Sequence, residues 1–428
     1  MKLIIGRTQY GVGQGGFHAC HIDMISPMPL LYRRLIGQKS TRFDFVYDCG
    51  TLSPGPGGVK KDVFLKNQIV KYVRNVERLD ALFLSHLDED HYNGAKELCS
   101  QTKVGRIFMP YFSLGEFWLL ILRQLAITDT AISNGYVNDL LSIVRGTSTR
   151  LFGIPVTVVG GPPPDSRVPS TDANNSPEVT LVEIRDDGTV GGLGSWVRNG
   201  ANIGLILESE LLNWMFRPWS YKQSQPAIDA MAKFLRSNKT LATLLAQKNI
   251  SDDVLKTIKS KKKSIRAAIE KIIRDGGGTY ATNNNSPSLC LYSGPRPDYE
   301  KRFIATYIER GSPESCLQHD PVGWLGTGDA LVKQHWHEFK SCYLDLFKAI
   351  GTFMLPHHGS KENHIEDFID AVSGRLAVIA AGNYTSHPDR EVLDYLGETQ
   401  CVVKQVTEYV QYGLHEIALI EDAADRII

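Results

Sequence analysis

The stretch Ser85-His86-Leu87-Asp88-Glu89-Asp90-His91 decides how this sequence is interpreted. It follows the apolar run Leu79–Leu84, which predicts a short strand, and precedes Asn93-Gly94, after which a helix is expected. Four side chains that can bind a metal ion lie within six residues: His86, Asp88, Asp90 and His91. A loop at a strand end can turn such imidazoles and carboxylates toward one point, and these nitrogen and oxygen donors suit Zn or Mn. The alternative is a polar loop in which Asp90 caps the helix, but a cap needs one carboxylate rather than a cluster.

The composition is that of an ordinary globular protein. The chain has 428 residues, of which 42% are apolar and 22% charged, and this excludes disordered, collagen-like and coiled-coil classes. Its 47 basic and 47 acidic residues cancel, so no overall positive field attracts nucleic acid or an anionic membrane. A polyanionic substrate would have to be bound by a local basic patch.

Neither a signal peptide nor a membrane span is expected. Met1–Gly6 contains only three consecutive apolar residues, and the longest apolar stretch, Phe117–Leu122, is far shorter than the ~20 residues that cross a bilayer. The seven cysteines form no C-x-x-C pair, which argues against a thiolate zinc site or a disulfide framework. We expect a cytoplasmic protein with no membrane partner.

The order of the expected elements predicts an α/β protein with a helical insertion. Strands at Lys2–Ile5, His18–Ile25 and Phe43–Tyr47 begin the chain, and strands alternate with helices from Leu79 onward. The pattern is wholly helical between Pro226 and Arg274. We therefore divide the chain into the first half of an α/β domain (1–210), a helical insertion (211–280) and the second half (281–428).

Two later motifs place ligand-type side chains directly after apolar strands. In Leu325-Gly-Thr-Gly-Asp329 a single carboxylate follows the strand, and the alternative role of Asp329 is a helix cap. Leu355-Pro-His-His-Gly-Ser360 offers the paired imidazoles of His357 and His358, which could also be solvated loop side chains.

The signature at His86 resembles that of the metallo-β-lactamase superfamily, H-x-H-x-D-H, with Asp88 at the second histidine. This variant looks most similar to the metallo-hydrolase domain of the bacterial competence DNA-uptake channel (ComEC-type), where the signature reads H-x-D-x-D-H. Shorter matches are Gly13-Gln14-Gly15, Val46-Tyr-Asp-Cys-Gly50, Asn284-Asn-Ser286 and Asn383-Tyr-Thr-Ser-His387-Pro388. The resemblance implies an αββα sandwich of the metallo-β-lactamase fold, interrupted by the helical subdomain.

The resemblance also implies a hydrolase with two divalent ions, Mn or Zn, that share an attacking hydroxide. The implied ligands are His86 and Asp88 for the first ion, Asp90, His91 and His357 for the second, and Asp329 as the bridge. Asp90 would also orient the hydroxide, and His358 and His387 would steady charge on a phosphoryl oxygen or protonate the leaving group. The motif leaves open which of His357 and His358 is the ligand.

The sequence departs from the family pattern at the first ion. The family carries a separate histidine before the bridging aspartate, but no histidine occurs from Tyr92 to Gln318. The first site is therefore expected to be rich in oxygen ligands, and such a site favours Mn over tightly held Zn.

Fold resemblance does not fix the substrate. The ComEC-like motifs favour phosphodiester hydrolysis of DNA or RNA, and a basic run would contact the phosphate backbone through Lys261, Lys262, Lys263 and Arg266. Most such runs are only solvated helix faces. The alternatives are a phosphodiesterase for a small molecule, such as a cyclic nucleotide or a phosphocholine-type ester, and an effector subunit of a multi-protein defence system whose insertion binds a partner protein.

Overall fold

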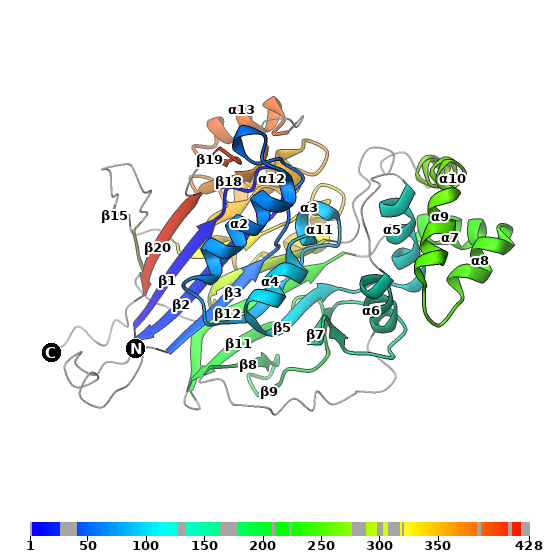
Figure 1. Ribbon diagram of the computed structural model, residues 1–428. Coiled ribbons are helices and arrows are strands. Elements are labelled where there is room, and N and C mark those ends of the chain that lie inside the picture. Colours follow the sequence, from blue (N-terminus) through cyan, green and yellow to red (C-terminus); the bar gives the residue numbers. More distant parts are fainter. Residues whose placement is uncertain are drawn as a thin grey trace.

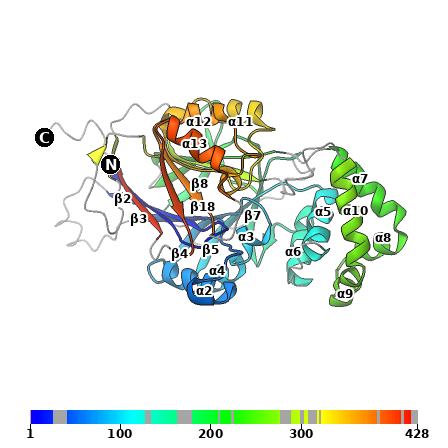
Figure 2. The ribbon, with the colours of Figure 1, turned by 90° about the horizontal axis from the view of Figure 1, so that it is seen from above.

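The structure is a computed structural model that describes residues 2–25, 41–126, 134–162, 179–207, 210–221, 225–275, 288–297, 303–306, 317–318, 321–382, 387–409 and 413–420. The motif positions 284–286 and 383–386 lie outside these ranges. Two large β-sheets lie one above the other, and helices cover their outer sides (Figures 1 and 2). The protein is therefore a mixed α/β structure, compatible with the expected α/β sandwich.

The first sheet begins with the N-terminal strands. In spatial order it contains β10 (Trp196–Val197), β7 (Ile154–Val159), β5 (Lys103–Pro110), β4 (Arg78–Phe83), β3 (Thr41–Tyr47), β2 (His18–Ile25), β1 (Lys2–Gln9), β20 (Leu414–Ile420), β14 (Phe303–Thr306) and β15 (Leu317–Gln318), and β6 (Arg150–Leu151) pairs with β7. Strands β3, β4, β5 and β7 are parallel, whereas β1, β2 and β3 are antiparallel neighbours. The sheet thus begins with antiparallel strands and continues with the alternation of strands and helices that the sequence predicts.

The second sheet gathers strands from the middle and the end of the chain. Its spatial order is β19 (Val402–Val406), β18 (Leu376–Ala380), β17 (Ile350–Met354), β16 (Gly323–Gly326), β13 (Leu289–Pro295), β12 (Glu210–Ser220), β11 (Asn202–Leu207), β8 (Val179–Ile184) and β9 (Val190–Gly192). Strands β16 to β19 are parallel. Both sheets therefore include a parallel segment.

An aromatic core joins the inner faces of the two sheets. Phe45 of β3 and Phe83 of β4 pack against Phe216 of β12, with ring centroids 5.1 and 5.6 Å apart. The parallel strands are buried on both faces, which explains their nearly continuous apolar sequences.

Helices cover the outer face of each sheet. On the first sheet they are α2 (Lys61–Val73) and α4 (Ala95–Gln101), and on the second they are α11 (Trp336–Tyr343), α12 (Glu366–Ala371) and α13 (Arg390–Glu398) (Figure 2). Short helical turns are α3 (Glu89–Tyr92), η1 (Pro56–Gly58), η2 (Phe347–Ala349) and η3 (Pro356–Gly359).

A helical lobe projects from one side of the sheets (Figure 2). It consists of α5 (Leu114–Ala126), α6 (Asn134–Val144), α7 (Gln225–Ser237), α8 (Lys239–Leu245), α9 (Asp252–Ser260) and α10 (Lys262–Asp275). Asn138 joins its two segments, since its side chain exchanges hydrogen bonds of 2.9 and 2.7 Å with the backbone of Ile250. Within the described residues, no helix combines the length and apolar character of a membrane span.

The boundaries of the predicted insertion differ from the structure in two ways. Residues 211–220, assigned to the insertion, belong to strand β12, and the helices begin at Gln225. The lobe also includes α5 and α6, which come from the first half of the chain. The apolar side chains of α5 explain the second difference, because they pack against α7, α9 and α10.

The parallel strands determine where the polar motifs meet. Asp48 follows β3 and His86 follows β4, while Asp329 follows β16 and His358 follows β17. Neighbouring parallel strands end at the same edge of a sheet, so each sheet gathers its loops at one edge. The two edges face each other and form the site described next.

Candidate metal centre

The ligand-type side chains of the sequence motifs come together between these two edges. The buried or partly buried members of this group, called the His/Asp cluster below, are His86, Asp88, Asp90, His91, Asp329, His357 and His358. The side chain of His357 is 17% exposed, whereas those of His91 and His358 are 4% exposed. His357 therefore lies at the rim of the cluster.

Asp329 lies at the centre of the His/Asp cluster. Its Oδ1 is 3.3 Å from His91 Nε2 and 3.8 Å from His358 Nε2. Its Oδ2 is 3.6 Å from His86 Nε2 and 3.7 Å from His357 Nε2. The two oxygens face different pairs of imidazoles, which is the arrangement that a carboxylate between two ions requires.

Asp90 lies beside His358, one of the two imidazoles between which the motif leaves the choice open. Its Oδ2 is 3.5 Å from His358 Nε2 and 3.8 Å from His91 Nε2. Among the described residues, two groups of three have ligand atoms within 4.8 Å of one another: Asp90, His91 and His358, and His86, His91 and Asp329. Ligand atoms that each lie about 2.1 Å from the same ion are separated from one another by distances similar to those measured here. The group around Asp90 contains His358, whereas the ligand set that the resemblance implied names His357 and leaves the choice between the two open.

Asp48 and Ser85 orient the rings of His86 and His91. Asp48 Oδ2 accepts hydrogen bonds from Ser85 Oγ at 2.7 Å and from His91 Nδ1 at 2.8 Å. Because the Ser85 hydroxyl proton is directed to Asp48, Ser85 Oγ accepts the Nδ1 proton of His86 at 2.9 Å. Both rings therefore turn Nε2 toward the cluster, as metal-binding histidines do when their other nitrogen is held.

His357 and His358 are oriented in the same way by the second sheet. Asn363 Nδ2 donates to two backbone carbonyls of the Asp329 loop, at 3.1 and 3.2 Å, so its Oδ1 accepts from His357 Nδ1 at 3.1 Å. His358 Nδ1 donates to the backbone carbonyl of Ala380 at the end of β18. Four imidazoles thus have Nδ1 engaged and Nε2 directed at carboxylates.

The backbone of η3 is strained where it carries these two imidazoles. His357 and His358 have φ angles of 46° and 56°, a left-handed conformation that is uncommon for residues with a side chain. Such strain persists only where the surroundings impose it, and it often marks functional positions. Here it brings adjacent histidines to different places, one at the rim and one in the interior.

The charges in the His/Asp cluster favour a cation. Burial lowers the pKa of His86 to about 3, so this ring is neutral and its Nε2 is a buried lone pair without a hydrogen-bond partner among the described residues. Burial also lowers the pKa of His91, but the carboxylates of Asp329, Asp48 and Asp90 together raise it well above its usual value. Without an ion, the negative charge is met by a proton on His91, and a bound cation would replace that proton. The residues therefore fit divalent metal ions.

Asp88 has a partner that the sequence did not indicate. Its Oδ2 is 3.8 Å from His86 Nε2 and also forms an ion pair with Arg123 of α5. Its Oδ1 is buried without a hydrogen-bond partner among the described residues. The only sequence signal for Arg123 is its position at the end of the apolar run Phe117–Leu122.

The Gly-rich turn before β2 packs against the back of the site. A Cβ atom on Gly16 would lie 2.6 Å from Asp48 Cβ and 3.1 Å from His91 Nδ1. The Gly16 N–H also donates to the Asp90 carbonyl at 3.1 Å. The turn that resembled a family motif thus supports the His/Asp cluster, although none of its residues is a ligand.

His387 lies outside the cluster but close to its rim. Its ring centroid is 5.2 Å from that of His357, its Nδ1 is 3.4 Å from Asp389 Oδ2, and its side chain is 20% exposed. The two partly exposed imidazoles therefore lie side by side at the edge of the site.

The predicted basic residues are not part of the site. Lys261 follows α9, and Lys262, Lys263 and Arg266 belong to α10, so the basic run spans a turn between two helices of the lobe. Lys263 and Arg266 are exposed, and Arg266 forms an ion pair of 2.9 Å with Glu270. Contact between these residues and a substrate stays a prediction.

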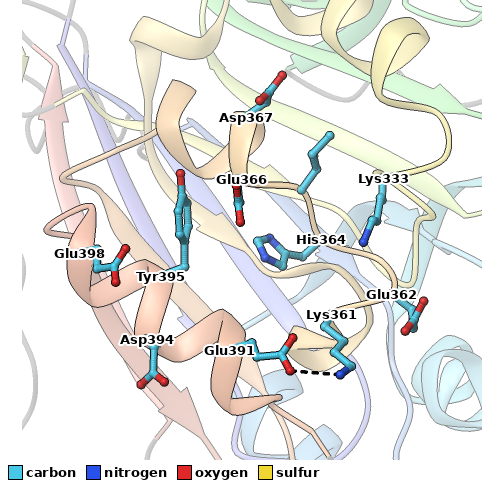
Figure 3. A pocket seen from close by; sticks show the side chains of 11 residues that line it. Lys333, Lys361, Glu362, His364, Glu366, Asp367, Glu391, Asp394, Tyr395 and Glu398 are labelled. Atoms are coloured by element: carbon cyan, nitrogen blue, oxygen red, sulfur yellow. Dashed lines mark hydrogen bonds and ion pairs between the residues drawn. The ribbon is translucent and has the colours of Figure 1, made fainter.

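A separate pocket of about 780 Å³ lies beside α12 and α13 (Figure 3). Its lining includes the lysines Lys333 and Lys361 and the acidic residues Glu362, Glu366, Asp367, Glu391, Asp394 and Glu398. Lys361 Nζ is 3.1 Å from Glu391 Oε1. The excess of carboxylates disfavours binding of a polyanion, so this pocket does not extend the site toward a nucleic acid.

No family model and no curated protein matches the sequence. Among solved structures, the crystal structure of unliganded yeast PDE1 is similar with a TM-score of 0.36 and 8% sequence identity, over 97% of this chain and 99% of that chain.

Proposed function

We propose that this protein is a hydrolase of the metallo-β-lactamase fold that uses two divalent ions, Mn or Zn, to cleave phosphodiester bonds. The observation that carries the proposal is the common orientation of four imidazoles, each held at Nδ1, around the two oxygens of Asp329. The ComEC-type motifs favour a polynucleotide substrate.

The first ion would be held by His86, Asp88 and one oxygen of Asp329. The second would be held by Asp90, His91, His358 and the other oxygen of Asp329. This assignment exchanges the roles of His357 and His358 relative to the sequence-based one, because the distances group His358 with Asp90. Bound ions of this kind supply an activated water and a Lewis acid for the oxygen under attack.

The chain's own residues would orient and protonate the substrate. His357 and His387 are the partly exposed imidazoles at the rim, so they are placed to contact a phosphoryl oxygen or to protonate a leaving group. Asn363 fixes the tautomer of His357 and thereby the direction of its Nε2. Asp48 and Ser85 would hold the interior imidazoles in place throughout.

The lobe supports a second candidate function. It is a separate helical body beside the site, and exposed charged side chains cover part of its surface. In this alternative the hydrolase is an effector whose lobe binds a partner protein, and the basic run contacts that partner instead of a nucleic acid. A phosphodiesterase for small molecules would use the same cluster without the lobe.

The decisive experiment compares substrates with one enzyme preparation. Purified protein with Mn is incubated in parallel with linear, circular and single-stranded DNA, with RNA and with cyclic dinucleotides, and the Asp329→Ala variant serves as the blank. Cleavage of a polynucleotide by the wild-type protein alone is the expected result. Cleavage of cyclic dinucleotides alone would establish the small-molecule alternative, and equal product with both proteins on every substrate would refute the proposed hydrolase.

A further inference from the structure

Two carboxylates in the loop after β4 have different partners. Asp88 and Asp90 are separated by one residue, and both are buried between the sheets. Asp90 Oδ2 faces the imidazoles of His91 and His358 and, among the described residues, has no arginine or lysine partner. Asp88 Oδ2 faces His86 and is held by Arg123.

Arg123 contacts the oxygen of Asp88 that also pairs with the His86 ring. His86 Nε2 is 3.8 Å from Asp88 Oδ2, and the Arg123 Nη2 atom contacts that oxygen. The guanidinium is well shielded from water, since the Arg123 side chain is 12% exposed and that of Asp88 11%. A buried arginine–carboxylate pair is costly to separate, because each charge would lose its partner in a medium of low polarity.

The two sites also differ in their other donors. The site around Asp90 has a complete set of two imidazoles and two carboxylates, counting one oxygen of Asp329. The site around His86 lacks the separate family histidine and shares its second carboxylate with a guanidinium. Among the described residues, its donors are His86 Nε2, Asp329 Oδ2 at 3.6 Å from it, and Asp88, whose Oδ2 is held by Arg123.

We infer that the two metal sites differ in affinity: one ion binds tightly to Asp90, His91, His358 and Asp329, and the second binds weakly at His86 because Arg123 holds Asp88. The inference rests on the metal centre of the proposed function. Arg123 is a positioning residue, since it acts on the ion through Asp88.

Helix α5 connects the lobe to the site, because Arg123 of this helix holds Asp88. Gln124, the next residue of α5, donates a hydrogen bond to the backbone carbonyl of Leu87, which precedes Asp88. The opposite side of α5 packs against α7, α9 and α10. Occupancy of the weaker site therefore depends on how the lobe holds α5.

Calorimetric titration of the metal-free full-length protein with Mn²⁺ alone tests the inference. The wild-type protein should bind two ions in steps whose dissociation constants differ about tenfold or more. Arg123→Gln releases Asp88 and should tighten the weaker step about tenfold while leaving the tighter step within about threefold. Two equal steps in the wild type, or an unchanged weaker step in the variant, would overturn the inference.

Two further variants separate this effect from general damage to the fold. Arg217→Gln is the matched control, because Arg217 is also a shielded arginine, 10% exposed, with an ion pair of 2.6 Å to Asp345 away from the cluster. It should leave both steps unchanged. In the double variant Arg123→Gln/Asp88→Asn the gain should disappear, since no carboxylate is released; a gain that persists would contradict the role of Asp88.

The result also distinguishes failure of the inference from failure of the proposed function. Absence of any bound Mn²⁺ in the wild type would reject the metal centre itself, and the inference with it. Two equal steps would reject only the unequal sites. If Arg123→Gln does not fold, Arg123→Lys serves instead: a lysine keeps one charge but loses the planar fork, so a smaller tightening of the weaker step is expected, and no tightening would count against the inference.

Discussion

The His/Asp cluster and the helical lobe hold their charged residues in opposite ways. In the cluster, the carboxylates and imidazoles are buried or partly buried, and specific neighbours orient the rings, such as Asp48 for His91 and Asn363 for His357. On α10 of the lobe, by contrast, the ion pair of Arg266 with Glu270 links side chains that are 55% and 48% exposed. Exposed pairs of this kind contribute little to stability.

This difference in burial predicts which substitutions change metal binding and catalysis. A buried, oriented group cannot be replaced by water, so its loss changes metal binding and chemistry directly. An exposed group acts through long-range charge, which salt weakens. Substitutions in the cluster should therefore affect every substrate, whereas those on the lobe should affect only large or charged partners.

Asp329→Ala should have the largest effect of any single substitution. Both metal sites share this carboxylate, so hydrolysis should fall by about 10³-fold or more with every substrate. Elemental analysis after loading with Mn should show fewer ions per chain. Glu416→Gln is the matched control, because Glu416 is a buried carboxyl group that bonds Thr352 outside the cluster. Loss of activity in the control of the same size would remove the distinction between the cluster and the rest of the core.

Asp48→Asn should have the next largest effect. The amide has one oxygen for the three donors that the Asp48 carboxylate accepts, which are the Ser85 N–H, the Ser85 hydroxyl and His91 Nδ1. The orientation and basicity of His91 are then lost, and affinity for Mn should fall about 10- to 100-fold. Titration of the metal-free protein measures this directly. An unchanged affinity would mean that Asp48 only supports the loop.

The cluster could be predicted from the sequence because its residues occur in short motifs. His86, Asp90 and His91 lie in one loop after a strand, and Asp329 ends a second such strand. Local spacing groups His86, Asp90 and His91, whereas the family resemblance was needed to add Asp329 to them. The choice between His357 and His358 was not predictable, because it depends on two successive left-handed backbone conformations that no residue type specifies.

The partners that orient the cluster could not be predicted, since they come from distant parts of the chain. Arg123 is 35 residues from Asp88, and Ala380 is 22 residues from His358. The start of the insertion was misplaced for a similar reason. In strand β12, Arg217 is paired with Asp345 and Pro218 lies opposite Leu291 of β13, so the partners of this strand also come from later parts of the chain.

The preference for Mn over Zn should be a smaller effect than the losses caused by the two substitutions above. Asp88 stands where the family signature has an imidazole, so the first site is richer in oxygen ligands and activity with Mn should exceed activity with Zn by several-fold, about 3- to 10-fold. Asp88→His should reverse the order, because it adds a nitrogen donor. Initial rates on one substrate across a titration of each metal provide the measurement. Equal or greater activity of the wild-type protein with Zn would contradict the prediction.

Charge reversal on the lobe should have the smallest effect, and only on a large substrate. Lys261, Lys262 and Lys263 lie at the turn from α9 to α10, away from the His/Asp cluster. If they guide a polynucleotide, each phosphate contact releases counterions, so binding weakens steeply with salt. Replacing all three with glutamate should raise the Michaelis constant for a polynucleotide several-fold, about 3- to 10-fold at low salt, and should reduce the salt dependence.

The same triple variant distinguishes a lobe that guides a polynucleotide from a lobe that binds a partner protein. Hydrolysis of bis-p-nitrophenyl phosphate should be unchanged, because this small ester needs only the cluster and its ions. If the lobe instead binds a partner protein, polynucleotide cleavage should also be unchanged, and the partner should no longer co-purify with the variant. A slower reaction with the small ester would show that the lysines act on the cluster through the lobe. The two regions would then be coupled, and the ion pair between Arg123 of α5 and Asp88 provides a contact for that coupling.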